Sequence, residues 1–295
     1  MYELIKVGDY TYYIDSPVKI GIYKINDNDV YLIDSGNDKY AGKKIKKILD
    51  ENNWNLKAII NTHSHADHIG GNRELQNKTN CEIYSIGVES AFINNTILES
   101  SLLYGAYPLK KLRNKFLLAK ESKSENIENV KLPEGLEYFE IHGHSIEMIG
   151  IRTSDDICFI ADSLFSENIL NKYHIMYLYN IERHLKTLDD LEKLEGKLFI
   201  PAHAEATNDI KNLIKLNRSK TYEIIDKIIK ICEIPISFED ILQSIFNEYG
   251  LTMNMNQYVL VGSTVKSYIS YLCDRNKLEF SVIDNKILYK EVTSL

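Results

Sequence analysis

The chain has 295 residues, of which 44% are hydrophobic and 26% are charged, and its formal net charge is −7. This length allows one large core of ~200 residues and a second, smaller unit, and the composition excludes a disordered chain. A net negative charge gives no general attraction to nucleic acid, so binding of a polyanion would need a local basic patch.

Two further features of the sequence bear on the cellular location of the protein. No stretch approaches ~18 apolar residues, and the first residues lack the basic and apolar regions of a signal peptide, so we expect a cytoplasmic protein with no membrane span. The four cysteines show no Cys-x-x-Cys spacing, and we expect them to be reduced and mostly buried.

The first part of the chain predicts strands and a helix. Residues 10–15, 19–26 and 30–34 are rich in β-branched and aromatic side chains and are separated by turn signals, which predicts a meander. A helix over 39–52 follows Asp38, a residue suited to the N-cap position. Strands with interposed helices fit two β-sheets packed face to face with helices outside.

A predicted strand over 57–61 leads into the most informative segment of the chain, Thr62-His63-Ser64-His65-Ala66-Asp67-His68. This segment holds three imidazoles and a carboxylate, and it precedes a predicted helix over 69–76. An extended turn directs successive side chains to opposite sides, so these groups suit two neighbouring metal ions better than one.

Each of the two ions needs further ligands. His63 and His65 suit the first ion, and Asp67 with His68 suits the second. A catalytic ion needs three protein ligands and an open position, and two ions ~3.5–4 Å apart need a shared anion. Later turns must therefore supply a third ligand for each ion and a bridging carboxylate. Three later residues follow short apolar, β-prone runs, as ligands at strand ends should: His144, Asp162 and His203.

In this order, the seven residues resemble the ligand motif of the metallo-β-lactamase-fold hydrolase superfamily, which is His-x-His-x-Asp-His followed by His, Asp and His. The resemblance covers residues 20 to about 205 and implies an α/β fold, a four-layer αβ/βα sandwich. It implies two divalent metal ions, with zinc expected and iron or manganese as alternatives. It also implies the role of each ligand: His63, His65 and His144 on the first ion, Asp67, His68 and His203 on the second, and Asp162 bridging them.

The chain departs from the family pattern at three positions. The family often has Pro-Gly-His-Thr-Pro-Gly around its fourth histidine, whereas residues 141–147 are Ile-His-Gly-His-Ser-Ile-Glu, so the usual Pro and Gly do not fix the turn after His144. Ala161 and Ala202 stand where glycine is common, which leaves the backbone slightly less freedom.

Three other histidines, His142, His174 and His184, are expected to be surface or core residues. A single histidine outside a motif is more often such a residue than a ligand. His142 lies two residues before His144, so contact with a ligand or with the substrate is kept as an alternative.

The ligand set predicts a hydrolase. Two cations that share one water lower its pKa, so a metal-bridging hydroxide is the expected nucleophile, and Asp67 is expected to orient it. The ligands match the glyoxalase II-like branch without substitution, so a thioester, another ester or a lactone is the expected substrate. We expect this small molecule to be anionic. An endoribonuclease or other phosphodiesterase is the alternative, by analogy with small relatives that end in a winged-helix-like domain. A β-lactam hydrolase is a weaker alternative.

Residues 89–124 interrupt the ligand series and are expected to be helical and partly lid-like. Within them, residues 108–116 interleave basic and apolar side chains at helical spacing, which predicts an amphipathic helix with a solvated basic face. The alternative is a rim that attracts an anionic substrate.

From residue 208 onward the metal motif has ended, and we place a boundary between a catalytic domain, 1–207, and a C-terminal domain, 208–295. The predicted elements resemble a winged helix: helices over 210–231, 241–249 and 262–276, and strands over 278–283 and 286–291. Basic and acidic residues are equal in number after residue 207, which disfavours phosphate contacts. We therefore expect this domain to form a homodimer contact or to roof the active site, in preference to binding nucleic acid.

Overall fold

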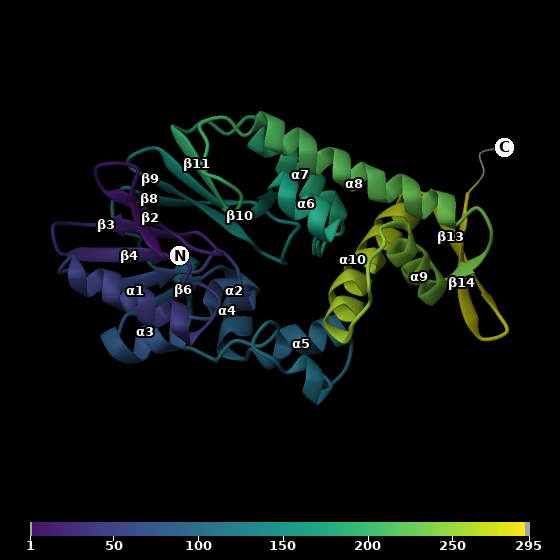
Figure 1. Cartoon of the computed structure of the whole chain (residues 1–295), viewed down its shortest axis with the longest axis horizontal. Coiled ribbons are helices and arrows are strands. Elements are labelled where there is room, and N and C mark those ends of the chain that lie inside the picture. Colours follow the sequence, from purple (N-terminus) through teal and green to yellow (C-terminus); the bar gives the residue numbers. More distant parts are fainter. Residues whose placement is uncertain (1, 293–295) are drawn as a thin grey trace.

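Two β-sheets packed face to face form the body of the protein, and helices cover both outer faces (Figure 1). The computed structural model of the chain describes residues 2–292. The first sheet has its strands in chain order: β1 (Glu3–Lys6), β2 (Thr11–Asp15), β3 (Ile20–Lys24), β4 (Asp29–Ile33), β5 (Asn55–Ile60), β6 (Glu82–Ser85) and β7 (Glu125–Asn126). The second sheet has the order β11-β10-β9-β8: β8 (Leu136–Glu140), β9 (Ile149–Thr153), β10 (Ile157–Phe165) and β11 (Leu198–His203). This arrangement confirms the expected α/β fold with a four-layer sandwich.

Three apolar clusters hold the four layers together. Strand β5 shows the alternation, because Ala58 and Ile60 lie in the cluster between the sheets whereas Ile59 lies in the cluster on the outer face. On that outer face, Ile45 of α1 (Lys39–Glu51) and Leu75 of α3 (Asn72–Thr79) complete the packing. The outer face of the second sheet packs in the same way on α7 (Ile181–Leu191) and α8 (Lys211–Ile231).

The first two predicted helices have different outcomes. The helix over 39–52 is confirmed as α1, and Asp38 caps it by accepting hydrogen bonds from the amides of Tyr40 and Ala41. The single helix over 69–76 is wrong, because α2 (Ala66–Ile69) and α3 replace it. The two helices separate at Gly70, where a Cβ atom would lie 2.3 Å from the backbone carbonyl carbon of Asn37. This close contact between backbones leaves room only for glycine.

The segment expected to be a helical lid begins with α4 (Gly87–Asn94) and α5 (Ile97–Tyr104). The amphipathic helix over 108–116 is wrong, since only a 3₁₀ turn at Lys110–Leu112 forms. The side chain of Asn114 ends this turn by donating to one backbone carbonyl and accepting from one backbone amide. Such local bonding of asparagine competes with a helix.

The C-terminal segment forms three helices and a small sheet: α8, β12 (Ile236–Ser237), α9 (Phe238–Glu248), α10 (Met255–Asp274), β13 (Leu278–Ile283) and β14 (Lys286–Glu291). The predicted hairpin is confirmed, with positive φ at both turn residues, Asp284 and Asn285, as a tight two-residue turn requires. Helix α10 begins well before the predicted Gly262, because the side chain of Asn254 caps it by accepting from the amide of Gln257.

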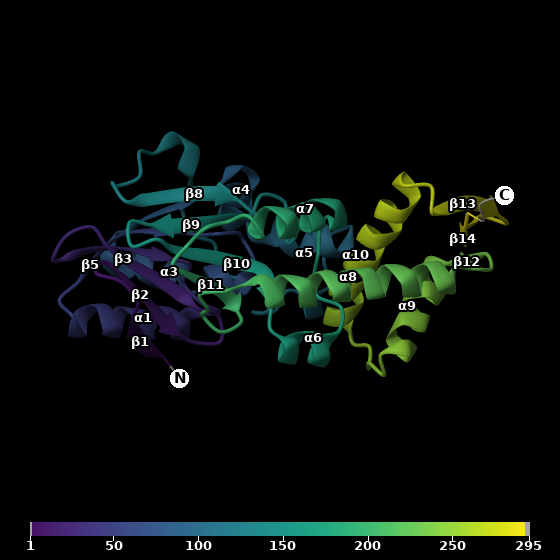
Figure 2. The same cartoon turned by 90° about the horizontal axis from the view of Figure 1, so that it is seen from above.

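Helix α8 connects the C-terminal segment to the second sheet, and it runs from that sheet to α9 and α10 (Figure 2). One apolar cluster contains Leu185 of α7, Ile214 and Ile224 of α8, and Leu242 of α9. The two expected domains therefore share a continuous core. The boundary after residue 207 and the winged-helix assignment stay predictions.

Two expectations about the whole chain can be compared with the described residues. Across residues 2–292, every helix is too short or too polar to cross a bilayer. All four cysteines are free: Cys81, Cys158 and Cys232 are buried and Cys273 is half-buried.

Candidate metal centre

All seven residues expected as metal ligands lie together in the structure. They come from five places: His63 and His65 from the loop after β5, Asp67 and His68 from α2, His144 from the loop after β8, Asp162 from β10, and His203 from the end of β11. One detail differs from the sequence-based expectation, because Asp162 lies inside β10 and not after it.

The segment 62–68 is extended only in its first half. His65 has φ −62° and ψ 146°, whereas Asp67 and His68 lie in the helical turn of α2. The change from extended to helical backbone, and not extension throughout, separates the two pairs of side chains.

The first cluster consists of His63, His65 and His144. Nδ1 of His65 lies 3.0 Å from Nε2 of His63 and 2.9 Å from Nε2 of His144. Zinc bonds of ~2.0–2.1 Å in a tetrahedron would hold nitrogens ~3.3 Å apart, so these three suit one ion. Burial lowers the pKa of all three rings, to about 4 for His65 and about 3 for His144. The rings are therefore neutral, which leaves their lone pairs available to a metal.

The second cluster consists of Asp67, His68 and His203, and Asp162 connects it to the first. Nε2 of His203 lies 3.5 Å from Oδ2 of Asp67 and 3.2 Å from Oδ2 of Asp162. Nε2 of His68 lies 3.0 Å from Oδ1 of Asp162. Oδ2 of Asp162 also lies 3.3 Å from Nε2 of His144. Asp162 therefore faces both clusters.

The histidines of the second cluster have raised pKa values, whereas those of the first cluster have lowered ones. Burial lowers the pKa of His203, but the carboxylates of Asp162 and Asp67 outweigh it and raise this pKa to about 10. The same competition raises the pKa of His68 well above its usual value. Protons on these histidines balance the buried carboxylates in the metal-free protein, and a divalent ion would replace them.

Two buried polar atoms test whether a metal fits here. Nε2 of His68 and Oδ1 of Asp162 have no hydrogen-bond partner among the described residues. They face each other at 3.0 Å. Buried polar atoms normally have a partner, and both of these are common metal donors. The donor set and the two unpartnered atoms both fit divalent metal ions.

Asp34 orients a ligand, although nothing in the sequence motif includes it. Its Oδ2 lies 2.7 Å from Nδ1 of His68, and its two oxygens also accept hydrogen bonds from the amide and the hydroxyl of Thr62. Such a contact fixes the ring of a metal-binding histidine. The available signal was a carboxylate at the end of a predicted strand beside the strand that leads to the motif.

Glu89 of α4 holds the turn that lacks the usual Pro and Gly. One carboxylate oxygen accepts from the amide and the hydroxyl of Ser64. The other accepts from the hydroxyl of Ser145 and the amide of Glu147. Glu89 therefore connects the two loops that carry the first cluster.

Two backbone positions near the ligands are constrained. Gly143 has φ 119°, and a Cβ atom there would lie 2.3 Å from the amide nitrogen of His184. Ala161 has φ 45° at a shift of register in β10. Positive φ at a non-glycine residue is strained, and here the strain lies directly before Asp162.

Glu99 of α5 brings a further buried carboxyl group to the centre. Its Oε1 lies 3.6 Å from Nε2 of His65. Burial, with Glu89 and Asp67 nearby, raises the pKa of Glu99 to about 8. The carbonyl oxygen of Tyr177 accepts a hydrogen bond of 2.9 Å from Nδ1 of His144, and the Tyr177 ring packs edge-on against His65. Neither residue lies in a recognisable motif.

The three histidines expected to be surface or core residues have partners of other kinds. Nδ1 of His142 lies 3.2 Å from a guanidinium nitrogen of Arg183. The ring of His174 stacks on Tyr249. His184 is buried in α7.

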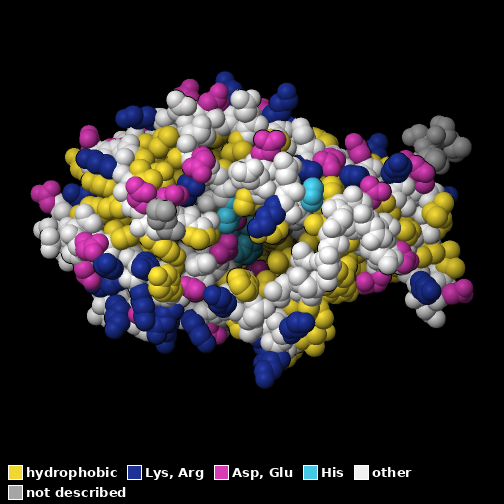
Figure 3. All heavy atoms as spheres, in the orientation of Figure 1, with side chains coloured by type: hydrophobic (Ala, Val, Ile, Leu, Met, Phe, Trp, Pro, Cys, Tyr) yellow, Lys and Arg dark blue, Asp and Glu magenta, His cyan; other side chains and the backbone are white. Residues whose placement is uncertain are grey.

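A pocket of about 580 Å³ lies against the two clusters, and His65, Asp67 and His203 line it. Figure 3 shows the hollow, with histidine and acidic side chains visible inside it. Leu251 and Leu260 of the C-terminal segment line it as well. The C-terminal segment therefore forms part of the pocket wall.

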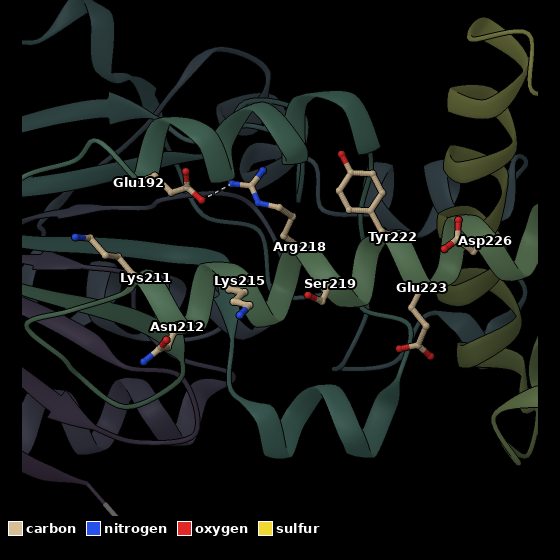
Figure 4. A pocket seen from close by; sticks show the side chains of 9 residues that line it. All are labelled: Glu192, Lys211, Asn212, Lys215, Arg218, Ser219, Tyr222, Glu223 and Asp226. Carbon is tan, nitrogen blue, oxygen red and sulfur yellow. Dashed lines mark hydrogen bonds and ion pairs between the residues drawn. The ribbon is translucent and has the colours of Figure 1, made fainter.

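A second hollow, of about 870 Å³, runs along the exposed side of α8 (Figure 4). Its lining includes both basic and acidic side chains, among them Lys211, Arg218 and Glu223. It contains none of the seven residues, and Arg218 is already paired with Asp189 and Glu192. Five of the seven residues line the first pocket instead.

The sequence profile of the Metallo-beta-lactamase superfamily matches residues 15–203. This match spans more than half of the chain and all seven residues of the two clusters. The chain belongs to the metallo-beta-lactamase superfamily. It is a metal-dependent hydrolase.

Curated relatives include two hydroxyacylglutathione hydrolases. The protein of Pelagibacter ubique (strain HTCC1062) is 27% identical over 190 residues, which are 61% of this chain and 70% of the relative. The protein of Prochlorococcus marinus (strain MIT 9301) is 27% identical over 154 residues, which are 50% of this chain and 54% of the relative. The chain thus spans about half to two thirds of these relatives. The resemblance to the glyoxalase II-like branch is confirmed.

Solved structures share the fold over nearly the whole chain. A beta-lactamase domain protein from Burkholderia ambifaria has a TM-score of 0.71 at 13% identity, covering 98% of this chain and 94% of that one. A metallo-beta-lactamase family protein from Thermus thermophilus has a TM-score of 0.70 at 12% identity, covering 99% of this chain and 98% of that one. Both similarities include the C-terminal segment, and at this identity they concern the fold alone.

Proposed function

We propose that the protein is a dinuclear metal hydrolase that cleaves a thioester, another carboxylic ester or a lactone. The carrying observation is that the donor atoms form overlapping groups, which two neighbouring ions would fill. The groups are His63 with His65 and His144, His63 with His68 and Asp162, and Asp67 with His68 and His203.

In this proposal each ligand has one role. The first ion would be held by His63, His65 and His144, the second by Asp67, His68 and His203, and Asp162 would bridge them. Zinc is the expected metal, although iron and manganese accept the same donors. When bound, two such ions supply an acidified water for attack and polarise the scissile carbonyl group.

Asp67 is the residue proposed to orient the attacking water. Its side chain is 42% exposed, against 5% for Asp162, and it lines the pocket. A partly exposed carboxylate in the wall can accept a hydrogen bond from water while its other oxygen faces His203. Asp34 and Glu89 hold the ligand loops in place through buried hydrogen bonds. Neither residue lines the pocket.

The nature of the scissile bond follows from the relatives and from the pocket. The hydroxyacylglutathione hydrolases are named for an acyl thioester. Cleavage of RNA has less support, because Lys115 is the only Lys or Arg among the described residues of the pocket wall. Phosphate contacts supply most of the affinity for nucleic acid, and the C-terminal segment has no excess of basic residues to make them.

The C-terminal hairpin supports a homodimer. Three large apolar side chains on one face of β13 and β14 are half or more exposed: Phe280, Val282 and Ile287. An exposed apolar patch of this kind is typical of a protein interface. Sedimentation of the wild type and of Phe280→Lys tests this assembly, since the variant should shift a dimer towards the monomer.

One substrate panel tests the proposed reaction. The full chain, loaded with zinc, is assayed with a thioester, a lactone, a phosphodiester, a cephalosporin and a short RNA. We expect hydrolysis of the thioester or lactone, loss of activity with a chelator, and recovery with zinc. Cleavage of RNA alone would replace this proposal with the ribonuclease alternative.

A further inference from the structure

We propose that the substrate carries an apolar acyl chain and that the pocket between the metal ligands and α10 binds this chain. The inference deepens the proposed function and rests on it. It is carried by the chemistry of the pocket wall away from the ligands, which is mostly aliphatic and aromatic. Six of these side chains are Phe116, Ile169, Met176, Leu251, Leu260 and Val261.

The apolar wall is a fixed part of the fold. Leu103, Leu112 and Leu117 pack with Val259 of α10 in one buried cluster. A hydrogen bond of 3.1 Å also joins the side chains of Asn114 and Asn256. These contacts hold the loop after α5 against α10. The pocket is therefore formed before a substrate binds, and binding costs little conformational entropy.

The same wall offers little to a charged acyl group. Lys115 is the only Lys or Arg among the described lining residues, and its Nζ lies 3.2 Å from Oδ2 of Asp38. Glu99, which also lines the pocket, is an acid. Against the apolar part of this wall, a charged or strongly polar chain would lose its hydration and find few partners, whereas transfer of an alkyl chain out of water is favourable.

The size of the chamber fits such a chain. Small-molecule sites usually occupy ~300–1,000 Å³, and this pocket has about 580 Å³. Burial of one methylene contributes ~0.8 kcal/mol, which is about fourfold in an equilibrium or rate constant. The kcat/KM should therefore rise by about two- to fourfold for each methylene added to the acyl chain, until the pocket is full.

A series of thioesters with one leaving group tests the inference. The zinc-loaded full chain is assayed with acetyl, butanoyl, hexanoyl and octanoyl thioesters of N-acetylcysteamine. Acetyl and octanoyl differ by six methylenes, so we expect kcat/KM to rise at least about 60-fold from acetyl to octanoyl. Hydrolysis of all four at similar rates, or a falling series, would overturn the inference while the proposed hydrolase remains.

A binding measurement decides the question without turnover. Calorimetry of the zinc-loaded protein with acetate, butanoate, hexanoate and octanoate keeps the carboxylate constant and varies only the chain. We expect octanoate to bind at least tenfold more tightly than butanoate, with a negative heat-capacity change. Equal affinities for all four carboxylates would overturn the inference, whether or not any thioester is hydrolysed. Absence of hydrolysis with a rising series of affinities would count against the proposed function alone.

A matched pair of variants on α10 locates the chain. Leu260→Gln replaces an apolar lining side chain with a polar one of similar size. The octanoyl-to-acetyl ratio of kcat/KM should fall at least fivefold. Ser270→Ala, at an exposed position of the same helix, should keep the wild-type ratio. A wild-type octanoyl-to-acetyl ratio in Leu260→Gln would show that the acyl chain does not lie against α10.

Discussion

Nδ1 of His68 lies 2.7 Å from Oδ2 of Asp34, and both side chains are almost completely buried. Asp34 is not a proposed ligand, yet this contact holds the ring so that Nε2 faces Asp162. Asp34→Asn keeps the size of the side chain and removes its charge. We expect zinc affinity at the second site to fall by about 10–100-fold, measured by competition with a chromophoric chelator.

Asp155→Asn is the control for that experiment. Asp155 accepts hydrogen bonds from the amides of Asp9 and Tyr10, away from the metal centre. This variant should lose stability and keep the wild-type zinc affinity. Wild-type affinity in Asp34→Asn would contradict the orienting role.

Asp162→Asn tests the bridging role. Oxygens of Asp162 face His68, His144 and His203, so loss of its charge leaves two neighbouring cations without a shared anion. We expect turnover to fall by at least ~10²-fold and metal affinity to fall with it. Steady-state kinetics and metal analysis of the same preparation measure both effects.

Ser163→Ala is the neighbouring control. Ser163 is fully buried, and its hydroxyl donates to the carbonyl of Ile160 at 2.6 Å, so it is not placed as a nucleophile. Its replacement should leave turnover nearly unchanged. Near-normal turnover with two bound ions in Asp162→Asn would show that the bridge is elsewhere.

Asn217→Ala tests how α8 supports the strand that carries Asp162. The amide group of Asn217 accepts from the backbone N–H of Phe165 and donates to the carbonyl of the same residue. The truncation leaves two buried backbone groups without these partners, so the free energy of unfolding should fall by about 1–3 kcal/mol. Asn212→Ala, on the exposed side of the same helix, should change it by less than ~0.5 kcal/mol in chemical denaturation. Equal stability of the two variants would refute this support.

His184 should make stability depend on pH. Burial lowers its pKa to about 3, with His144 and Arg218 adding to the effect, whereas an unfolded histidine has a pKa of ~6.5. The unfolded state binds the extra proton below that value, so this contribution is complete above about pH 6.5 and is lost as the pH falls towards 3. Between pH 7 and pH 5, the wild type should lose about 2 kcal/mol more stability than His184→Gln. Denaturant titrations at both pH values measure this difference, and parallel losses would contradict it.

The sequence could predict that these seven residues lie together because each belongs to a short local pattern. Histidine and aspartate follow apolar strand-like runs, and the order of strands then brings them together. Glu89 could not be found in this way. Its partners Ser64 and Ser145 are 25 and 56 residues away in the chain, so its role arises only from the packing of α4 against both loops.

Two predicted helices were wrong where contacts elsewhere in the fold outweighed the local periodicity of the sequence. The helix expected over 69–76 is divided into α2 and α3 at Gly70 and Gly71, where the backbones of Asn37 and Ser35 lie too close for a side chain. Within the amphipathic pattern over 108–116, Leu112 is buried against Val259 of α10, and Leu117 just after the pattern joins the same cluster. Periodicity alone did not predict that a C-terminal helix would cover this loop.

The central claim is that the seven residues hold two metal ions, and metal content per chain, combined with anomalous diffraction at the zinc edge, tests it most directly. We expect two ions per wild-type chain, one beside His65 and one beside His203, with Asp162 between them. His65→Ala should lose occupancy at the first position and retain the second. A wild-type protein that never binds more than one ion under zinc-replete conditions would contradict the account.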